Sequence, residues 1–362
     1  MESTEQDLSA REFVSILLWM PNWIGDAILA LPTIDSLRKR FPQSRITVVS
    51  RAPADELLRG MPLIDSVITS PPRKAGFWSQ VQFARGLKKY NFDLAVTFPN
   101  SFRSAFLLSL TGAKTRLGHE TGARSMFLTH GVETTSAQTR SQYRVDYFFN
   151  ALAPLKLEGP GKGLPEVGKL NGDASVDEAL SRLGVRAGDF FALIHPGSSK
   201  PERGWHHERF TILCQKLIKE RNIKIVLLGN EQERPMLEQI RKFSPDEMVS
   251  ILPKLNLREV ALVMARCGVF VGNDSGMMHL AAMMRRPVTA IFGPGSSDTT
   301  GPYMDRNELE VISLNFPCSP CRQRFFTECK PSSNRKPFCL ENISVKEVAE
   351  GLNRLLNRLD QP

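Results

Sequence analysis

The chain has 362 residues, more than a single hydrophobic core usually supports, so we expect two domains. Hydrophobic residues make up 41% of the sequence and charged residues 23%, which excludes an intrinsically disordered chain. The 47 lysines and arginines exceed the 38 acids, and the net charge of +9 favours an anionic partner. Because the basic residues are dispersed along the chain, we expect no nucleic-acid binding.

The first residues, MESTEQDLSAREF, are acidic and polar, unlike a secretory signal. No stretch approaches the roughly 18 apolar residues of a membrane-spanning helix. We therefore expect a cytoplasmic protein. Six cysteines are too few for a disulfide scaffold in a chain of this length, so we expect reduced thiols or metal ligands.

The first part of the chain alternates short apolar runs with segments of helical periodicity. Strands are predicted at 14–20, 45–50 and 92–98, and helices at 27–41, 78–90 and 104–113. Such alternation is typical of βαβ units and a parallel sheet. The stretch that follows is rich in Gly, Pro and Lys, contains one short helix at 174–184, and is predicted to be a linker.

The alternation then starts again. Strands are predicted at 190–197, 223–230, 268–274 and 287–294, and helices at 207–222, 233–243, 257–267, 276–286 and 344–359. We therefore predict an α/β protein with two Rossmann-like domains, whose parallel sheets face a central cleft. The predicted boundaries are an N-terminal domain at 1–158, a linker at 159–188, a C-terminal domain at 189–342 and a last helix at 343–362.

A lone acid, Asp26, stands at a strand-to-helix junction, in the sequence FVSILLWMPNWIGDAILALP. Such junctions present side chains to ligands, because the strand's carboxyl end and the helix's N-terminus open onto the same crevice. An acid in the first turn of a helix also caps its free N–H groups. On this stretch alone, ligand contact and capping are equally supported.

A second junction, VFVGNDSGMMHLAA, follows the strand predicted at 268–274. Its small residues suit a diphosphate at a helix N-terminus, whereas a tight turn with an Asp cap is the alternative. The spacing of Asp274, Ser275, Gly276 and His279 would let a carboxylate and an imidazole share the hydroxyls of one sugar.

Three more loops follow predicted strands in the same half. IHPGSSKPERGWHHERF contains small residues and two cations, Ser198, Ser199, Lys200 and Arg203, and AIFGPGSSDTTGPY contains a second Gly/Ser loop. Trp205 is expected in the core, and His206 and His207 on the surface. In LLGNEQER, Glu231 and Glu233 are candidates for ribose hydroxyls. The sequence contains no G-x-G-x-x-G, P-loop or serine nucleophile elbow, which argues against a nicotinamide dehydrogenase, an NTPase and a serine hydrolase.

In their order and spacing, four stretches resemble the ADP-heptose:lipopolysaccharide heptosyltransferases, which are GT-B glycosyltransferases, and most of all the heptosyltransferase II group. They are PNWIGDAILALPTIDSLRKRFP, PNSFRSAFLLSLTGAKTRLGH, HPGSSKPERGW and NDSGMMHLAAMMRRPVTAIFGPGSS. The resemblance covers nearly the whole chain. It implies that the C-terminal helix can pack back across the cleft.

The resemblance assigns roles to individual residues. Asp26 falls at the family's catalytic base, and Arg203 falls where the family usually has a phosphate-binding Lys. Arg keeps the charge but replaces a point ammonium with a planar fork. The family's donor contacts fall on Ser198, Ser199, Lys200, Glu231 or Glu233, Leu255 at the adenine, Asp274, Ser275, Gly276 and His279.

The implied reaction is an inverting transfer of heptose from ADP-heptose to the inner core of lipopolysaccharide, Kdo/heptose-lipid A. Asp26 would accept the proton of the acceptor hydroxyl while Arg203 and Lys200 hold the departing ADP. No cofactor is required. Kdo carboxylates and phosphates of the acceptor would meet cations of the N-terminal domain, namely Arg73, Arg103, Arg116 and Arg124. The protein would contact the inner membrane peripherally at its cytoplasmic face.

Two alternatives stay open: a GT-B transferase that uses another nucleotide-sugar or a protein acceptor, and a non-catalytic nucleotide-sugar binding protein. The sequence does not set the oligomeric state. Four thiols, Cys318, Cys321, Cys329 and Cys339, lie in one Pro-rich loop. They suit a structural tetrahedral zinc or iron site, but the second pair lacks the two-residue spacing of a zinc ribbon, so four reduced thiols are equally supported.

Overall fold

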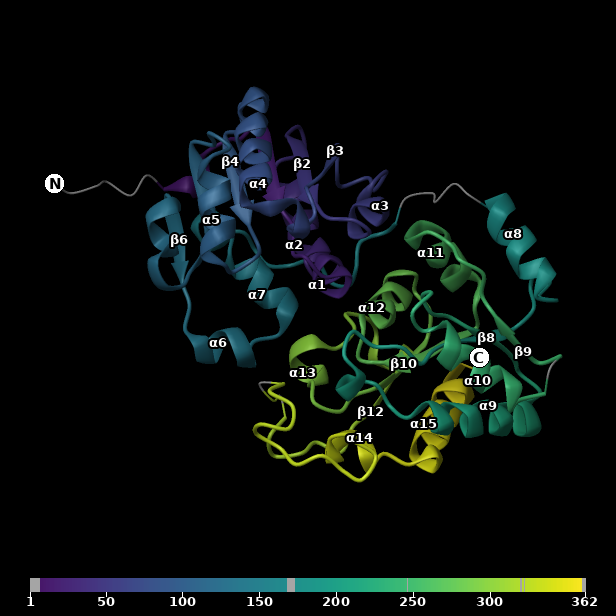
Figure 1. Ribbon diagram of the computed structural model, residues 1–362. Coiled ribbons are helices and arrows are strands. Elements are labelled where there is room, and N and C mark those ends of the chain that lie inside the picture. The colour runs from purple at the N-terminus through teal and green to yellow at the C-terminus, as the bar shows by residue number, and fades with distance from the viewer. Residues whose placement is uncertain (1–6, 168–172, 246, 320, 322, 360–362) are drawn as a thin grey trace. The chain divides into compact units, whose positions relative to one another are not determined.

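A computed structural model describes residues 7–167, 173–245, 247–319, 321 and 323–359. The chain forms two compact units, Met1–Gly168 and Lys169–Pro362. Each unit contains a six-stranded sheet with helices packed on it (Figure 1). Every strand pair in both sheets is parallel, which confirms the predicted α/β class with two parallel sheets.

The first sheet has the strand order β3-β2-β1-β4-β5-β6. Its strands are β1 (Ser15–Trp19), β2 (Arg45–Ser50), β3 (Ser66–Thr69), β4 (Leu94–Thr97), β5 (Thr115–Glu120) and β6 (His130–Glu133). The central strands β1 and β4 are continuous apolar runs because both of their faces are covered. Three strands of this sheet were not predicted from the sequence: the inner strand β5 and the outer strands β3 and β6, which are partly exposed and more polar.

The helices of the first unit connect these strands. They are α1 (Ile24–Leu29), α2 (Leu31–Arg40), α3 (Ala54–Leu58), α4 (Gly76–Gly86), α5 (Phe102–Ser109), α6 (Ser136–Ser141) and α7 (Arg144–Asn150). The helix predicted at 27–41 is divided at Ala30, because Pro32 has no N–H and occupies the first turn of α2. One hydrophobic core joins α4 and α5 to β1, β2 and β4.

The second sheet has the strand order β12-β11-β10-β7-β8-β9. Its strands are β7 (Phe191–His195), β8 (Lys224–Leu227), β9 (Val249–Ile251), β10 (Val269–Asn273), β11 (Val288–Ile291) and β12 (Leu309–Ile312). The helices are α8 (Asp173–Arg182), α9 (His207–Arg221), α10 (Arg234–Lys242), α11 (Leu257–Arg266), α12 (Gly276–Met283), α13 (Ser297–Thr300), α14 (Phe338–Glu341) and α15 (Val345–Leu359). The last helix, α15, packs against α9, β11 and β12 of its own unit.

In each sheet, the order in which successive strands are added reverses its direction at one point. In the first sheet the chain goes outward from β1 to β2 and β3, and then returns to the other side of β1 with β4. The second sheet repeats this pattern with β7 and β10. Ligands of open α/β sheets bind beyond the carboxyl ends of the strands at such switch points. The loops after β1, β4, β7 and β10 are therefore the expected positions of functional residues.

Candidate active site

The loops after β7 and β10 are held together by one buried side chain, Asn273. Its Oδ1 accepts a hydrogen bond of 2.9 Å from the N–H of Trp205, and its Nδ2 donates to the carbonyls of Pro196 and Gly197 at 2.8 and 3.2 Å. These contacts fix the path of the loop that carries Lys200 and Arg203. Sequence reasoning assigned no role to Asn273.

The structure brings Arg203 and Asp274 into direct contact. An Nη2 of Arg203 lies 2.5 Å from Oδ2 of Asp274 and 3.3 Å from its backbone carbonyl. Burial raises the pKa of Asp274, while the guanidinium of Arg203 opposes that rise. The Nε of Arg203 is buried and makes no hydrogen bond to the described part of the chain. Arg203 therefore has a donor, Nε, without a partner among the described residues, and such a donor can form a hydrogen bond with a phosphate oxygen.

Ser275 and Glu233 approach the same place through His195, at the end of β7. Ser275 Oγ lies 3.4 Å from Nδ1 of His195, and Nε2 of His195 lies 3.7 Å from Oε2 of Glu233. Burial raises the pKa of Glu233, but the contact with His195 and the N–H of Asn230 outweigh it, and the pKa lies below its ordinary value. A Cβ at Gly197 would overlap the carboxylate of Glu233 and displace that side chain from His195.

His279 lies in the first turn of α12, which begins at Gly276 after the N-cap Ser275. Its ring is almost fully buried, and burial, together with the charge of Arg203, lowers its pKa to about 4. At neutral pH the ring is therefore uncharged. Within the described residues, Nδ1 of His279 is buried and has no hydrogen-bond partner.

The remaining predicted donor residues lie along the same edge of the second sheet. Ser198 donates to the carbonyl of Lys200, which shapes the turn, and Ser199 and Lys200 are exposed. Glu231, after β8, is exposed, and Leu255, after β9, is half-buried. Glu231 and Leu255 are not part of the contact between Arg203 and Asp274.

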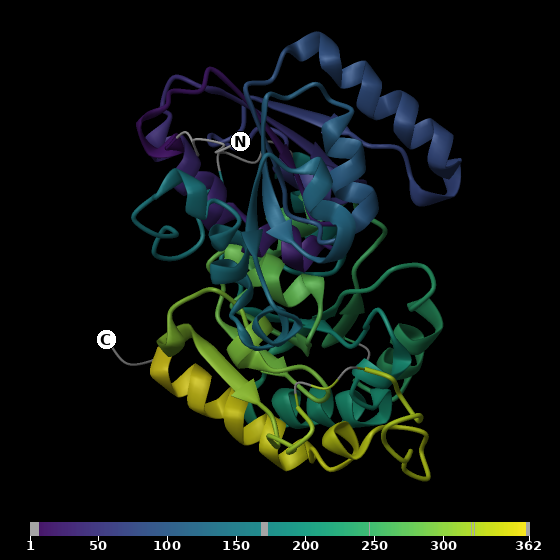
Figure 2. The same ribbon diagram turned by 90° about the vertical axis from the view of Figure 1, so that its left-hand side faces the viewer.

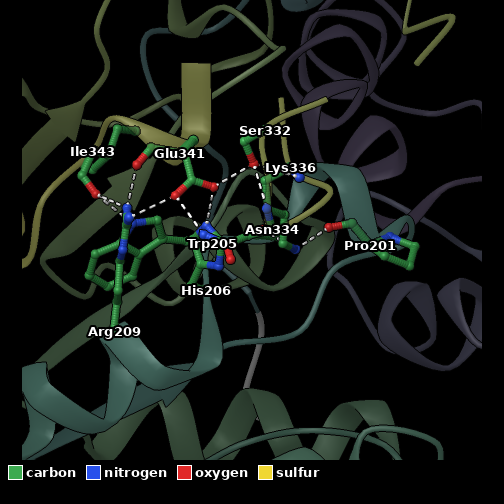
Figure 3. A network of polar contacts seen from close by, with 10 residues as sticks. Pro201, Trp205, His206, Arg209, Ser332, Asn334, Lys336, Glu341 and Ile343 are labelled. Carbon is green, nitrogen blue, oxygen red and sulfur yellow. Dashed lines mark hydrogen bonds and ion pairs between the residues drawn. The ribbon is translucent and has the colours of Figure 1, made fainter. Parts of the chain in front are cut away.

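The loop after β7 is also held from the C-terminal segment (Figure 3). Lys336 Nζ donates to the carbonyls of Pro201 and Gly204, at 2.5 and 2.7 Å, on both sides of Arg203. Glu341 accepts hydrogen bonds from Ser332 and Asn334 and contacts His206 Nε2 at 3.0 Å. These contacts anchor the cationic loop to α14 and to the segment before it.

Two expectations about this segment have different outcomes. Trp205 is buried, as predicted, and its Nε1 donates to the carbonyl of Ile343 at 2.9 Å. The prediction that His206 lies on the surface is wrong, because its side chain is only 11% exposed beside Glu341. His207 is exposed, as expected of the first residue of α9.

In the first unit, Asp26 occupies the first turn of α1, just after β1. Its side chain is 34% exposed, and Oδ1 lies 4.0 Å from Nε of Arg144, the first residue of α7. Arg144 packs on the ring of Tyr147 at 5.0 Å, which fixes the guanidinium near Asp26. Sequence reasoning did not single out Arg144, because α7 comes beside α1 only in the folded unit.

The four predicted acceptor cations differ in their surroundings. Arg124 is buried, and an Nη1 donates to Asn100 Oδ1 at 2.6 Å and to the carbonyl of Pro99 at 3.0 Å, beside the end of β4. Burial lowers its pKa to about 10. Arg103 is exposed at the start of α5. Arg116 donates to the carbonyls of Ala113 and Phe127 at 2.7 and 2.8 Å. It is not part of the contact between Arg124 and Asn100.

The fourth cation, Arg73, begins a short 3₁₀ helix, Arg73–Ala75, and its side chain lies outside the described part. The four C-terminal thiols line one cavity of about 330 Å³, together with Phe325 and Phe338. Among the described residues, no three cysteines, histidines or acids are placed to hold a metal ion. The structure therefore supplies no preformed metal site there.

Comparison with known proteins places these features in context. The model of glycosyltransferase family 9 (heptosyltransferase) matches residues 80–330. Lipooligosaccharide heptosyltransferase 2 of Haemophilus influenzae is 26% identical over 305 residues, which cover 81% of this chain and 87% of that protein. Lipopolysaccharide heptosyltransferase 2 of Escherichia coli is 25% identical over 355 residues, which cover 95% of this chain and 99% of that protein.

The fold has known counterparts as well. The solved structure of E. coli ADP-heptose lipopolysaccharide heptosyltransferase II matches with a TM-score of 0.76 at 23% identity, covering 96% of this chain and 100% of that one. This likeness confirms the predicted GT-B fold class.

Proposed function

We propose that this chain, which belongs to glycosyltransferase family 9, the heptosyltransferases, transfers heptose from ADP-heptose to the inner core of lipopolysaccharide. The family resemblance predicted from the sequence is confirmed, and with it an enzyme of the glycosyltransferase class. The names of the relatives support lipopolysaccharide as the acceptor. The observation that carries the proposal is the cationic loop with Arg203 and Lys200, held beside the N-terminus of α12.

On the donor side, the departing group of an ADP-sugar is a diphosphate. Arg203, with its unused Nε, and the exposed Lys200 would neutralise the charge that develops as the glycosidic bond breaks. The free N–H groups and dipole of α12 would add to this stabilisation. Neutral His279 and Ser275 would take sugar or ribose hydroxyls, and Ser198, Ser199, Glu231, Glu233 and Leu255 would line the rest of the nucleotide site.

On the acceptor side, Asp26 would act as the base. In a single displacement, the acceptor oxygen attacks the anomeric carbon, the bond to the diphosphate breaks, and Asp26 takes the hydroxyl proton. The attack comes from the face opposite the leaving group, so the configuration inverts. Arg144, beside Asp26, and the exposed Arg103 would hold acidic groups of the acceptor, because Kdo carboxylates and phosphates are anions. Arg124, which is 1% exposed, would instead fix the loop after β4.

The acceptor is a membrane lipid, so we also propose that the protein meets the cytoplasmic face of the inner membrane peripherally. In the part of the chain that the structure describes, no helix is both long and apolar enough to cross a bilayer.

Transfer is tested by mass spectrometry of a Kdo-lipid A acceptor after incubation with ADP-heptose, with UDP-sugars as the comparison. We expect one added heptose from ADP-heptose alone. Transfer from a UDP-sugar instead would point to the alternative donor class, and donor binding without turnover would point to a binding protein.

For the cysteine loop, we propose one structural zinc or iron ion, held by Cys318, Cys321, Cys329 and Cys339. The shared cavity supports this assignment, but the thiols would have to draw together to reach tetrahedral geometry. The ion would order the loop and take no part in transfer. Elemental analysis of protein purified without chelator should find about one atom per chain; none would remove the assignment.

A further inference from the structure

The first unit carries large apolar side chains on its surface, at one edge of its sheet. Phe77 and Trp78 follow β3, Phe102 follows β4, and Met126 follows β5, with exposed fractions of 41%, 74%, 54% and 72%. Because all strands of this sheet are parallel, Phe77, Trp78 and Phe102, at the starts of helices after β3 and β4, lie toward its carboxyl edge. Met126 lies in the 3₁₀ helix Gly122–Phe127 that leads to β6. We call these four residues the edge patch. Asp26 follows β1 at the same edge.

Ring contacts join the aromatic members of the edge patch. Phe77 stacks on Phe106 with centroids 5.9 Å apart, and Phe106 contacts Phe127 at 5.4 Å. Phe127 in turn contacts Phe102 at 5.1 Å, and Met126 is its neighbour in the chain. The half-buried rings Phe106 and Phe127 therefore hold the exposed ones in place. In Figure 2, the blue helix α4, whose first turn carries Phe77 and Trp78, stands out from the rest of its unit.

The surroundings of the edge patch are basic. Residues 66–132 contain nine lysines and arginines and only two acids, Asp93 and Glu120. Two of the cations are exposed beside the patch: Lys74 just before α4, and Arg103, whose guanidinium lies 5.6 Å from the ring of Phe77. A soluble surface rarely groups exposed Trp, Phe and Met side chains in this way without a partner.

We propose that the edge patch docks on an anionic lipid surface. Tryptophan and phenylalanine partition into the interface between headgroups and acyl chains, and neighbouring lysines and arginines bind anionic headgroups. This combination of aromatic and cationic side chains fits lipid better than an apolar protein face, which would leave Lys74 and Arg103 without anions. The inference rests on the proposed function, since a lipid-linked acceptor gives the docking its purpose.

Docking at this edge would bring the acceptor to the base. Asp26, Arg124 and the edge patch all follow strand ends of one parallel sheet, so the same surface would lie against the headgroups from which the acceptor's sugars project. The acceptor would not have to leave the bilayer.

The test is sedimentation of the full chain with vesicles that contain neither donor nor acceptor. Vesicles of phosphatidylethanolamine and phosphatidylglycerol should bind the protein, and vesicles of phosphatidylcholine should bind it much more weakly. Trp78→Ser combined with Met126→Ser should weaken binding about tenfold or more, and Lys74→Glu should weaken it several-fold and reduce its salt dependence.

Matched controls separate the patch from general charge and hydrophobicity. Val14→Ser combined with Phe243→Ser removes two side chains of 72% and 62% exposure outside the patch and should leave binding unchanged. Lys88→Glu changes a charge about 20 Å along the same helical segment and should have less effect than Lys74→Glu. Equal effects in patch and control variants, or no binding by wild type, would overturn the proposal.

Two further readouts separate lipid docking from a failure of catalysis and from self-association. Transfer to a deacylated, soluble acceptor should proceed equally in wild type and in the Trp78 and Met126 variant, whereas transfer to vesicle-embedded acceptor should fall in the variant. If the wild type transferred heptose to neither acceptor, the result would contradict the proposed function and would leave the vesicle-binding test of the docking surface unaffected. Self-association in sedimentation velocity that disappears with Trp78→Ser would assign the patch to a second copy and overturn lipid docking.

Discussion

The two switch points of this protein are built differently. Beyond β7 and β10, the loops are joined by Asn273, by the contact of Arg203 with Asp274, and by Lys336, so the cations are in place before a ligand arrives. Beyond β1 and β4, Asp26 is one-third exposed, and its Oδ1 lies 4.0 Å from Nε of Arg144.

This difference has a physical rationale. A nucleotide diphosphate is small and uniform, so a rigid site lowers the cost of ordering when it binds. An acceptor that belongs to a large lipid-linked sugar brings its own charged groups, and a more open site receives it. We therefore expect changes on the acceptor side to act on the chemical step, and changes on the donor side to act on affinity.

The largest effect is expected from Asp26→Asn. An amide keeps the shape of the carboxylate but cannot accept the proton, so transfer should slow by roughly a hundredfold or more, while donor affinity and stability stay close to wild type. Rates are measured with saturating ADP-heptose and soluble acceptor. Asp35→Asn on α2, whose carboxylate pairs with Lys39, is the control. A near wild-type rate for the Asp26 variant would make capping its role.

A smaller effect is expected from Arg203→Lys. Lysine keeps the charge but has no planar fork with which to hold Asp274 and a phosphate together. The KM for ADP-heptose should rise about tenfold, with kcat less affected. Arg234→Lys, on the surface of α10, is the matched control. An unchanged KM would mean that the guanidinium of Arg203 binds Asp274 but does not bind the donor.

The central parts of both sheets and the loops after them could be predicted from sequence. Apolar runs such as those of β1 and β7 are buried on both faces, and each is followed by a turn and an amphipathic helix. The outer strands escaped prediction for a physical reason. Edge strands such as β6, HGVE, are short and half exposed, so neither a continuous apolar run nor a clear alternation marks them.

Residues whose role depends on tertiary contact were also missed. The role of Asn273 cannot be inferred from its motif, because its partners Pro196 and Trp205 are about seventy residues away. Arg144 and Lys336 are ordinary surface cations in the sequence and reach their positions only through α7 and the C-terminal segment. The assignment of the donor to one unit and the acceptor to the other stays a prediction.

A still smaller effect is expected from Lys336→Met. Its ammonium holds the carbonyls on both sides of Arg203, so its loss should loosen the loop without removing a ligand contact. We expect the KM for ADP-heptose to rise by a factor of about three to ten, with kcat and acceptor KM unchanged. Lys346→Met in α15, whose side chain is 80% exposed, is the control. An equal change in both variants would exclude a role in positioning the loop.

The smallest effect on turnover at neutral pH concerns two buried histidines whose pKa is strongly lowered, His119 in the first unit and His279 in the second. Burial lowers the pKa of His119 and of His279 to about 4, against an ordinary value of 6.5. Between these values the unfolded chain binds a proton that the folded chain does not, so the free energy of unfolding should fall as the pH drops from about 6.5 to about 4. The full loss is roughly 3 kcal/mol per histidine.

Urea unfolding at several pH values tests this expectation in both units. In wild type the midpoints should fall below pH 6.5 and be level between pH 7 and 8, where both rings are neutral in both states. His119→Asn should reduce the pH dependence of the first unit alone. His279→Gln should reduce that of the second, where His206, whose pKa burial also lowers, leaves a remainder. Both units would then lose stability at acid pH for the same reason, although their sites differ. The reason is the burial of a histidine ring and not the chemistry of a ligand. A pH dependence that survives undiminished in both variants would mean that other groups carry the acid sensitivity.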